Sequence, residues 1–118
     1  MIIAQPDRVI LRMQVSKFAK ELSGSVLDLG GGNGNRYKHL FKSIVSLDIN
    51  PDNNPDIVGS AEDIPLDDES MDSILCTQLL EHVPHPLQVF SEMFRVIKPG
   101  GKAFLTVPQW NELHHNAV

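Results

Sequence analysis

The sequence contains little cysteine, few basic residues and no long apolar run. Its single cysteine, Cys76, cannot form an internal disulfide, which is consistent with a reducing compartment. The 10 lysines and arginines are outnumbered by 15 acidic residues, so the formal net charge is −5, and no basic block is present to bind nucleic acid. No apolar run approaches the roughly 18 residues that span a membrane, and residues 1–6 lack the order of a signal peptide. We therefore expect a cytoplasmic protein that binds neither nucleic acid nor membrane.

The length and composition fit one globular domain. The chain has 118 residues, of which 42% are hydrophobic and 21% are charged. A chain of this size buries enough surface to form a core without disulfides or metal ions. We expect a single domain over residues 1–118, with an N-terminal helix at 6–22, a core at 26–108 and a tail at 109–118.

Apolar residues at helical spacing predict the helices. The first helix covers residues 6–22, and its expected inner face consists of Leu11, Val15, Phe18 and Leu22. Another covers residues 86–97, and its expected inner face consists of Leu87, Phe90, Phe94 and Ile97. Between them we expect a shorter helix at 36–42, with Leu40 and Phe41 turned inward.

Runs of apolar and β-branched residues predict the strands. The expected strands are Val26–Leu29, Ile44–Asp48, Ile57–Val58, Met71–Thr77 and Ala103–Val107. Ile57–Val58 is expected to be short, because too few residues precede it for a full crossover from the strand before. The order of helices and strands is typical of an α/β protein: a mostly parallel sheet of about five strands, with helices on both faces, in three layers.

A glycine-rich turn follows the first expected strand. It reads Asp28-x-Gly30-x-Gly32-x-Gly34, and glycine lets the backbone approach a ligand closely. Ligands of open α/β sheets bind at this end of the strands. Asp48 ends the second strand 18 residues after Gly30, at a spacing where a carboxylate accepts hydrogen bonds from the hydroxyls of a ribose. Together these features predict a nucleoside site.

Two classes of ligand share such a ribose carboxylate, and the glycine spacing distinguishes them. A dinucleotide site needs Gly-x-Gly-x-x-Gly. In the two possible frames, Asn35 or Tyr37 stands where the third glycine would be. A nicotinamide-dependent oxidoreductase is therefore the less favoured alternative.

The alternation of an acidic residue with glycines resembles the cofactor loop of class I S-adenosylmethionine-dependent methyltransferases, of the methyltransferase type 11 kind. Other segments are similar to the same family, namely Gly59–Pro65, Gln78–Val83 and Arg95–Gly101. The resemblance covers nearly all of residues 26–108. It implies a Rossmann-like fold, S-adenosylmethionine as the cofactor, and transfer of its methyl group to an acceptor that we expect to be a small molecule.

The resemblance also implies which residues bind the cofactor. Asp28, Gly30 and Gly32 would hold the methionine end, and Gln78 would lie beside it. Asp48 would hold the ribose hydroxyls.

Three further residues are implied around the adenine. Ile49 would cover one face of the base, and the Ala61 backbone with the Glu62 region would meet its edge. Many relatives have aspartate where this chain has Ser60, which accepts a hydrogen bond but adds no charge.

No catalytic side chain and no metal site is assigned from the sequence. The sulfonium of the cofactor already activates the methyl group, so the protein mainly orients the reactants, which contributes about 7–11 kcal/mol. His82 is the candidate base for an acceptor that must lose a proton, although such a histidine more often packs or forms a structural hydrogen bond. The sequence has neither His-Glu-x-x-His nor a cysteine pair for zinc, and Cys76 is expected to be a buried apolar residue.

Members of the family usually continue past the fifth strand with elements that shape the acceptor pocket. We therefore expect the fold to be truncated after that strand. The chain is then either a methyltransferase or a non-catalytic S-adenosylmethionine-binding module or regulatory subunit, and turnover would distinguish them. The apolar strand Ala103–Val107 would lie at an edge, so we expect another copy, a partner chain or the tail at 109–118 to cover it.

Overall fold

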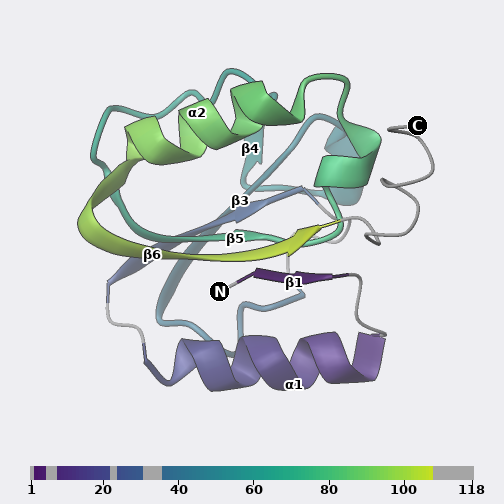
Figure 1. Ribbon diagram of the computed structural model, residues 1–118, viewed down its shortest axis with the longest axis vertical. Coiled ribbons are helices and arrows are strands. Elements are labelled where there is room, and N and C mark those ends of the chain that lie inside the picture. The colour runs from purple at the N-terminus through teal and green to yellow at the C-terminus, as the bar shows by residue number, and fades with distance from the viewer. Residues whose placement is uncertain (1, 5–7, 22–23, 31–35, 108–118) are drawn as a thin grey trace, which may run out of the picture.

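Six parallel strands form one sheet in the computed structural model, which describes residues 2–4, 8–21, 24–30 and 36–107. The strand order is β1-β6-β5-β2-β3-β4 (Figure 1). The strands are β1 (Ile2–Ala4), β2 (Ser25–Leu29), β3 (Ser43–Asp48), β4 (Ile57–Val58), β5 (Met71–Cys76) and β6 (Ile97–Val107).

Two helices cover opposite faces of this sheet (Figure 1). They are α1 (Arg8–Ala19) and α2 (Pro86–Val96), and the short 3₁₀ turns η1 (Pro51–Asn53) and η2 (Leu80–His82) follow β3 and β5. This arrangement confirms the three-layer α/β fold with a parallel sheet. Within the described ranges, neither helix has the length and hydropathy needed to cross a membrane.

The middle of the sheet is buried on both sides. Leu27, Ile74 and Leu75 have no exposed surface, as expected for parallel strands enclosed between two helical layers. One apolar cluster joins Leu27 and Ile74 to the inner side of α2. The other packs α1 against the opposite face, where the rings of Phe18 and Phe104 have their centroids 5.4 Å apart.

The register of the central strands brings their carboxyl ends together. Leu29 of β2 lies opposite both Leu47 of β3 and Cys76 of β5. The residues that come next therefore meet at the same edge of the sheet, which puts Gly30 near Asp48.

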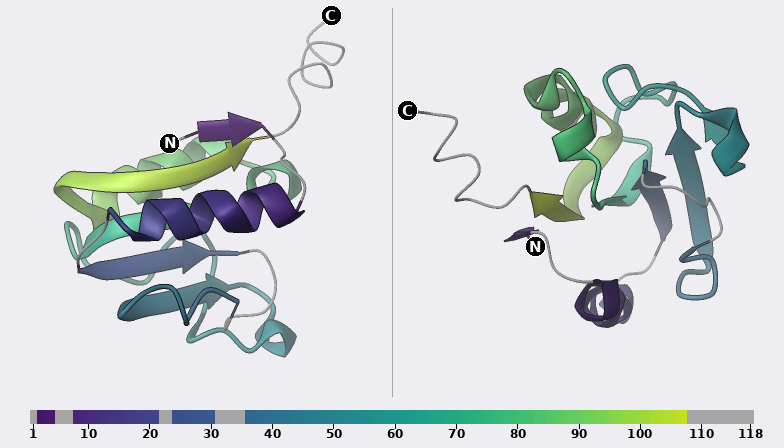
Figure 2. Two further views of the ribbon diagram at one scale, coloured as in Figure 1. Left: turned by 90° about the horizontal axis from the view of Figure 1, so that it is seen from below. Right: turned by 90° about the vertical axis from the view of Figure 1, so that its right-hand side faces the viewer.

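The strand β1 was not predicted, and it changes the outer edge of the sheet. Ile2–Ala4 pair in parallel with Leu105–Val107, so β1 covers the last three residues of β6 (Figure 2). The expectation that the strand Ala103–Val107 is itself an edge awaiting another chain or the tail was wrong. The tail at 109–118 lies outside the described residues. Three residues are too few to show a strand period, and their partner lies at the far end of the sequence.

The helix expected at 36–42 does not form. Residues 36–40 are turns, in which the amide of Leu40 donates to the carbonyl oxygen of Tyr37 over 3.0 Å. Leu40 and Phe41 are nevertheless half-buried and pack against the cluster beneath α1, as expected. So short a segment has too few hydrogen bonds to offset the cost of starting a helix.

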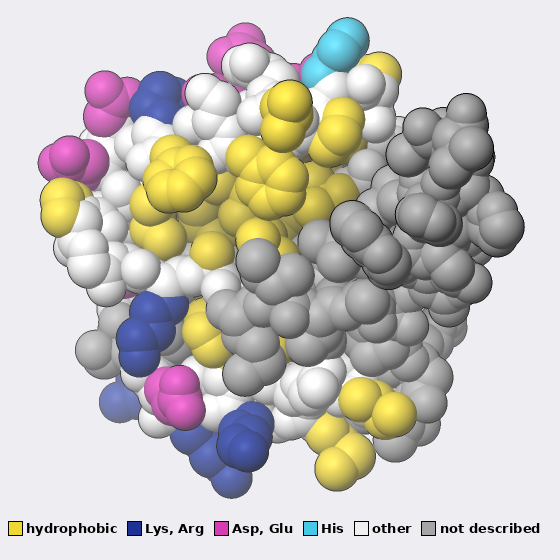
Figure 3. Space-filling model, viewed as in Figure 1, with side chains coloured by type: hydrophobic (Ala, Val, Ile, Leu, Met, Phe, Trp, Pro, Cys, Tyr) yellow, Lys and Arg dark blue, Asp and Glu magenta, His cyan; other side chains and the backbone are white. Residues whose placement is uncertain are grey.

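The second helix begins where expected and ends one residue earlier, at Val96, but part of its predicted inner face is exposed. Its buried residues are Val89, Glu92, Met93 and Val96. Leu87 and Phe94, predicted to face inward, are each 80% exposed, while Phe90 and Ile97 are partly buried. The helix has two apolar stripes, and its periodicity alone does not decide which one meets the sheet. Figure 3 shows hydrophobic side chains gathered on the surface over α2 and β6.

A pair of alanine substitutions tests this assignment of the faces of α2. We expect Met93→Ala to lower the free energy of unfolding by about 2–5 kcal/mol, because it leaves a cavity in the core. Phe94→Ala should change it by no more than about 0.5 kcal/mol, because the ring is mostly in water. Chemical denaturation of both variants measures the difference. Equal destabilisation by the two substitutions would contradict the assignment.

Candidate functional site

A cavity of about 650 Å³ lies at the carboxyl edge of the sheet. The loops that follow β2, β3, β4 and β5 line it, as expected where parallel strands end together. Most of the residues that the sequence predicted as cofactor ligands line it too, namely Gly30, Asp48, Ile49, Ala61, Glu62 and Gln78. Its size suits a small molecule, since such sites measure roughly 300–1,000 Å³.

Gly30 forms the cavity wall after β2 with its bare backbone. Its φ is +63°, and a Cβ built on it would come within 2.6 Å of the Leu79 side chain. Its amide donates to the carbonyl oxygen of Leu47 over 2.8 Å, which fixes the turn against β3. A side chain is therefore excluded here, and a ligand can approach the main chain. Gly32, predicted to act beside it, lies outside the described residues.

Asp28 lies behind this wall and does not line the cavity. Its side chain is only 2% exposed and forms an ion pair with Arg36, whose Nη2 is 2.9 Å from Oδ1. Nη2 also donates to the Gly30 carbonyl oxygen over 3.2 Å and to the Thr77 hydroxyl over 2.6 Å. Burial raises the pKa of Asp28, and the Arg36 charge partly counteracts this effect. That Asp28 contacts the cofactor directly stays a prediction.

Arg36 is a site residue that the sequence analysis missed. Its guanidinium joins the ends of β2 and β5 to the glycine turn, and it lies 4.6 Å from the centroid of the Tyr37 ring. The only signal in the sequence was a basic residue shortly after the glycines. Periodicity placed it in a helix and gave no indication that its side chain would turn back to Asp28.

Asp48 presents its carboxylate at the adjacent wall, after β3. The side chain is 9% exposed. Oδ1 accepts a hydrogen bond from the amide of Asn50 over 2.8 Å, and Oδ2 accepts one from Nδ2 of Asn53 over 3.1 Å. A carboxylate has about four acceptor positions, so both oxygens can still accept from a ligand. Ile49 follows it with 73% of its side chain exposed, an apolar surface at the cavity.

The loop after β4 forms a third wall and has its own hydrogen bonds. The Ser60 hydroxyl accepts from the amide of Glu62 over 3.0 Å. Oε1 of Glu62 lies 2.7 Å from Nδ1 of His85, and Gln88 donates to the Glu62 carbonyl oxygen over 3.1 Å. Ser60, noted as a departure from the family pattern, therefore shapes the turn that presents Ala61 and Glu62.

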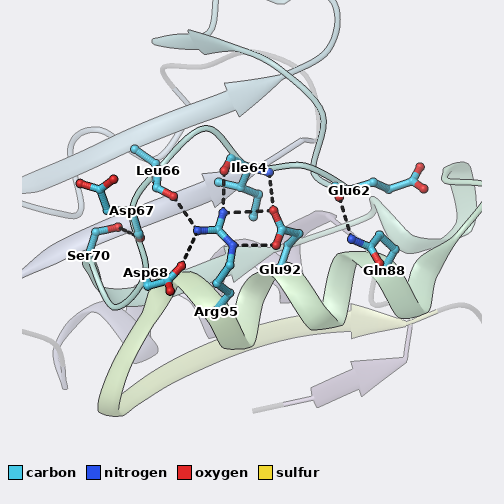
Figure 4. Close-up of polar contacts among 9 residues, drawn as sticks. All are labelled: Glu62, Ile64, Leu66, Asp67, Asp68, Ser70, Gln88, Glu92 and Arg95. Carbon is cyan, nitrogen blue, oxygen red and sulfur yellow. Dashed lines mark hydrogen bonds and ion pairs between the residues drawn. The ribbon is translucent and has the colours of Figure 1, made fainter.

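An ion pair on α2, between the buried Glu92 and the partly exposed Arg95, holds the continuation of this loop. Glu92 is 8% exposed, and its Oε1 accepts from the amide of Ile64 over 2.8 Å. Arg95 donates to Oε2 of Glu92 over 2.7 Å and to the carbonyl oxygens of Ile64 and Leu66 over 2.7 and 2.8 Å. Figure 4 shows Arg95 between Glu92 and this loop, with Asp68 at its outer side. The contacts fix the loop whose first residues line the cavity.

The segment after β5 completes the site. Gln78 has a left-handed backbone with φ +56°, and its amide donates to the Thr106 hydroxyl over 2.6 Å. His82 also lines the cavity, and its side chain is 73% exposed. Cys76 is fully buried, and burial raises the pKa of its thiol to about 12. The thiol is therefore protonated at neutral pH, which agrees with its expected role as an apolar core residue.

The parallel sheet and the cavity at its carboxyl edge define a Rossmann-like α/β protein. The chain belongs to the methyltransferase domain family, whose pattern matches residues 27–105. It is 33% identical over 101 residues to an uncharacterized methyltransferase of Mycobacterium bovis BCG Pasteur 1173P2, and 35% identical over 102 residues to one of Mycobacterium ulcerans Agy99. Each match covers 73% of this chain but only 40% of the relative, so the chain spans less than half the length of these curated relatives.

Solved structures share the same fold. A Bacillus halodurans C-125 protein, provisionally named a methyltransferase, superposes with a TM-score of 0.69 and 26% identity over 85% of this chain and 50% of that one. A Pyrococcus horikoshii OT3 protein gives a TM-score of 0.71 and 25% identity over 96% of this chain and 64% of that one. Both contain further chain beyond the shared part.

Substitution of Glu92 by glutamine tests the ion pair that holds the loop. Hydrogen bonds from Arg95 are the main reason that the pKa of Glu92 lies below its ordinary value. Ionised Glu92 therefore stabilises the fold above the ordinary pKa of glutamate, about 4.3, and this contribution is lost as the pH falls through the lowered pKa. We expect stability to decline less steeply with acid in Glu92→Gln than in the wild type.

Urea unfolding from neutral pH down to about pH 3 measures this slope. Glu69→Gln provides the control, because Glu69 is an exposed carboxylate on the neighbouring turn. If Glu92→Gln and Glu69→Gln keep the same acid dependence as the wild type, the ion pair does not contribute as described.

Proposed function

We propose that the cavity binds S-adenosylmethionine and that this chain provides the cofactor half of a methyltransferase. The observation that supports this most is the Asp48 carboxylate, which lies in one cavity with the side-chain-free backbone of Gly30. A carboxylate at the end of the second strand suits the ribose hydroxyls, and an open glycine turn suits a ligand that contacts the main chain. The family to which the chain belongs makes the same ligand the first choice.

The adenine side of the cavity also fits such a ligand. Ile49 offers an exposed apolar surface next to Asp48, and the buried Ala61 lies in the loop across the cavity. We propose that the base lies against Ile49, with its edge toward Ala61 and Glu62. Asp28 and Gly32 keep their predicted association with the methionine end, Asp28 acting from behind the wall through Arg36.

The chemistry proposed for this site needs orientation more than it needs an acid or a base. S-adenosylmethionine, when bound, supplies a methyl group that its sulfonium has already activated. The residues of this chain would hold the nucleoside at fixed walls and exclude water from the methionine end. Orientation of this kind contributes about 7–11 kcal/mol to a displacement. We propose His82, which also lines the cavity, as the base for an acceptor that needs to lose a proton.

The acceptor is proposed to be a small molecule, because the chain is acidic overall, with a net charge of −5. A cytoplasmic location stays a prediction. A non-catalytic cofactor-binding module is the second candidate. Both functions require binding, and only the first requires methyl transfer.

A thermal-shift experiment tests the ligand. We expect S-adenosylhomocysteine at about 100 times its Kd to stabilise the chain by about 2.7 kcal/mol, seen as a rise in Tm, because it binds the folded state alone. NAD at the same concentration should leave the Tm unchanged. Stabilisation by NAD and not by S-adenosylhomocysteine would instead support the oxidoreductase alternative.

Replacement of Asp48 tests the ribose contact. Asp48→Asn should raise the Kd for S-adenosylhomocysteine roughly tenfold or more, because hydrogen bonds to a charged group contribute about 1.5–3 kcal/mol. Asp52→Asn is the matched control, since Asp52 is an exposed neighbour on η1 outside the cavity lining. Isothermal titration calorimetry measures both. Equal affinities for Asp48→Asn and the wild type would refute the contact.

A further inference from the structure

The proposed ligand has a sulfonium and an ammonium group at its methionine end, and a carboxylate in the site would stabilise these positive charges. Asp28 is the residue implied by the family resemblance. It is 2% exposed and lies outside the cavity lining. Both of its oxygens already accept from Arg36, over 2.9 and 3.4 Å. Its charge is therefore compensated within the protein.

Two of the carboxylates that do line the cavity are also engaged. Glu62 is 2.7 Å from Nδ1 of His85. Asp48 accepts from Asn50 and Asn53 and lies at the wall proposed for the ribose. Glu62 is therefore paired within the protein, and Asp48 is assigned to the ribose.

Glu81 differs from these carboxylates. It lines the cavity on η2, and its Oε2 is buried with no hydrogen-bond partner among the described residues. Its other oxygen, Oε1, is 3.8 Å from Nε2 of the exposed His82, which is beyond hydrogen-bonding distance. A buried carboxylate oxygen without a donor is costly, and such groups are uncommon in folded proteins. A ligand that supplies a donor or a positive charge would remove this cost.

The position of Glu81 matches the methionine end rather than the adenine end. Glu81 lies on η2, in the segment that follows β5, and this segment begins near Gln78, the residue expected beside the methionine end. Cys76, at the end of β5, lies opposite Leu29, the residue before Gly30. The Glu62 and His85 pair belongs to the loop after β4 and to the start of α2, at the adenine side.

We propose that the Glu81 carboxylate, rather than Asp28, meets the positive charge at the methionine end of the bound cofactor. The inference rests on the proposed function, because it assigns a residue to the same ligand. Glu81 then determines specificity: it favours ligands that have an ammonium or sulfonium group over the neutral nucleoside. Asp28 is a positioning residue that acts through Arg36 on the Gly30 carbonyl.

Three ligands that differ in charge test this proposal by calorimetry. S-adenosylmethionine has a sulfonium and an ammonium, S-adenosylhomocysteine has the ammonium without the sulfonium, and 5′-methylthioadenosine has neither. Glu81→Gln removes the charge and keeps the shape. We expect it to raise the Kd for S-adenosylmethionine roughly tenfold or more and to leave the Kd for 5′-methylthioadenosine within about twofold of the wild type. An equal loss for S-adenosylhomocysteine identifies the ammonium as the partner of Glu81, and a smaller loss identifies the sulfonium.

Glu62→Gln is the matched control, because it removes the same charge from the other side of the same cavity. It should not change the ratio of the affinities for the charged and neutral ligands. Glu81→Ala, which leaves no buried amide, replaces Glu81→Gln if the latter lowers the Tm of the unligated chain. The proposal is overturned if Glu81→Gln weakens all three ligands equally, weakens none, or matches Glu62→Gln. A wild-type chain that binds none of the three would overturn the proposed cofactor, and this inference with it.

Discussion

The parallel register of β2 with its two neighbours is the constraint on which the site depends. Leu29 lies opposite Leu47 and Cys76, so β2, β3 and β5 end within one residue of the same level in the sheet. One cavity is therefore lined by the turn at Gly30, the Asp48 carboxylate and the segment after β5, although these are far apart in the sequence. A slip of one residue would turn alternate side chains to the other face, and Asp48 would no longer point into that space.

Two of the buried carboxylates among the described residues each form an ion pair with an arginine. Arg36 compensates Asp28 and holds the glycine turn, and Arg95 compensates Glu92 and holds the loop after β4. A buried carboxylate is tolerated when it is paired and hydrogen-bonded, and each pair here also satisfies backbone carbonyl groups. Two walls of the cavity are therefore fixed by side chains that never reach it. Among the described residues, no arginine pairs with Glu81, so its buried oxygen is left without a donor.

Most of the fold was predictable from the sequence, because the central strands are continuous apolar runs and the turn residues are distinctive. The cavity residues Gly30 and Asp48 were predictable for the same reason, since they directly follow such runs. Features that depend on contacts with residues far away in the sequence were not predictable. The predicted inner face of α2 was wrong for Leu87 and Phe94, because the helix has two apolar stripes and only packing against the sheet decides between them. Arg36 gave no local sign that its side chain would turn back to Asp28.

The pairing of β1 with β6 also bears on how the chain acquires its structure during synthesis. Ile2–Ala4 precede the other described strands in the sequence, and their hydrogen-bonding partners, Leu105–Val107, follow all of them. Contacts between such distant segments have a large loop-closure entropy and form slowly. The pairing of β2 with β3 can therefore form before β1 has its partner strand. Among the described strands, β1 therefore pairs only after β6, which is last in sequence order, has been synthesised.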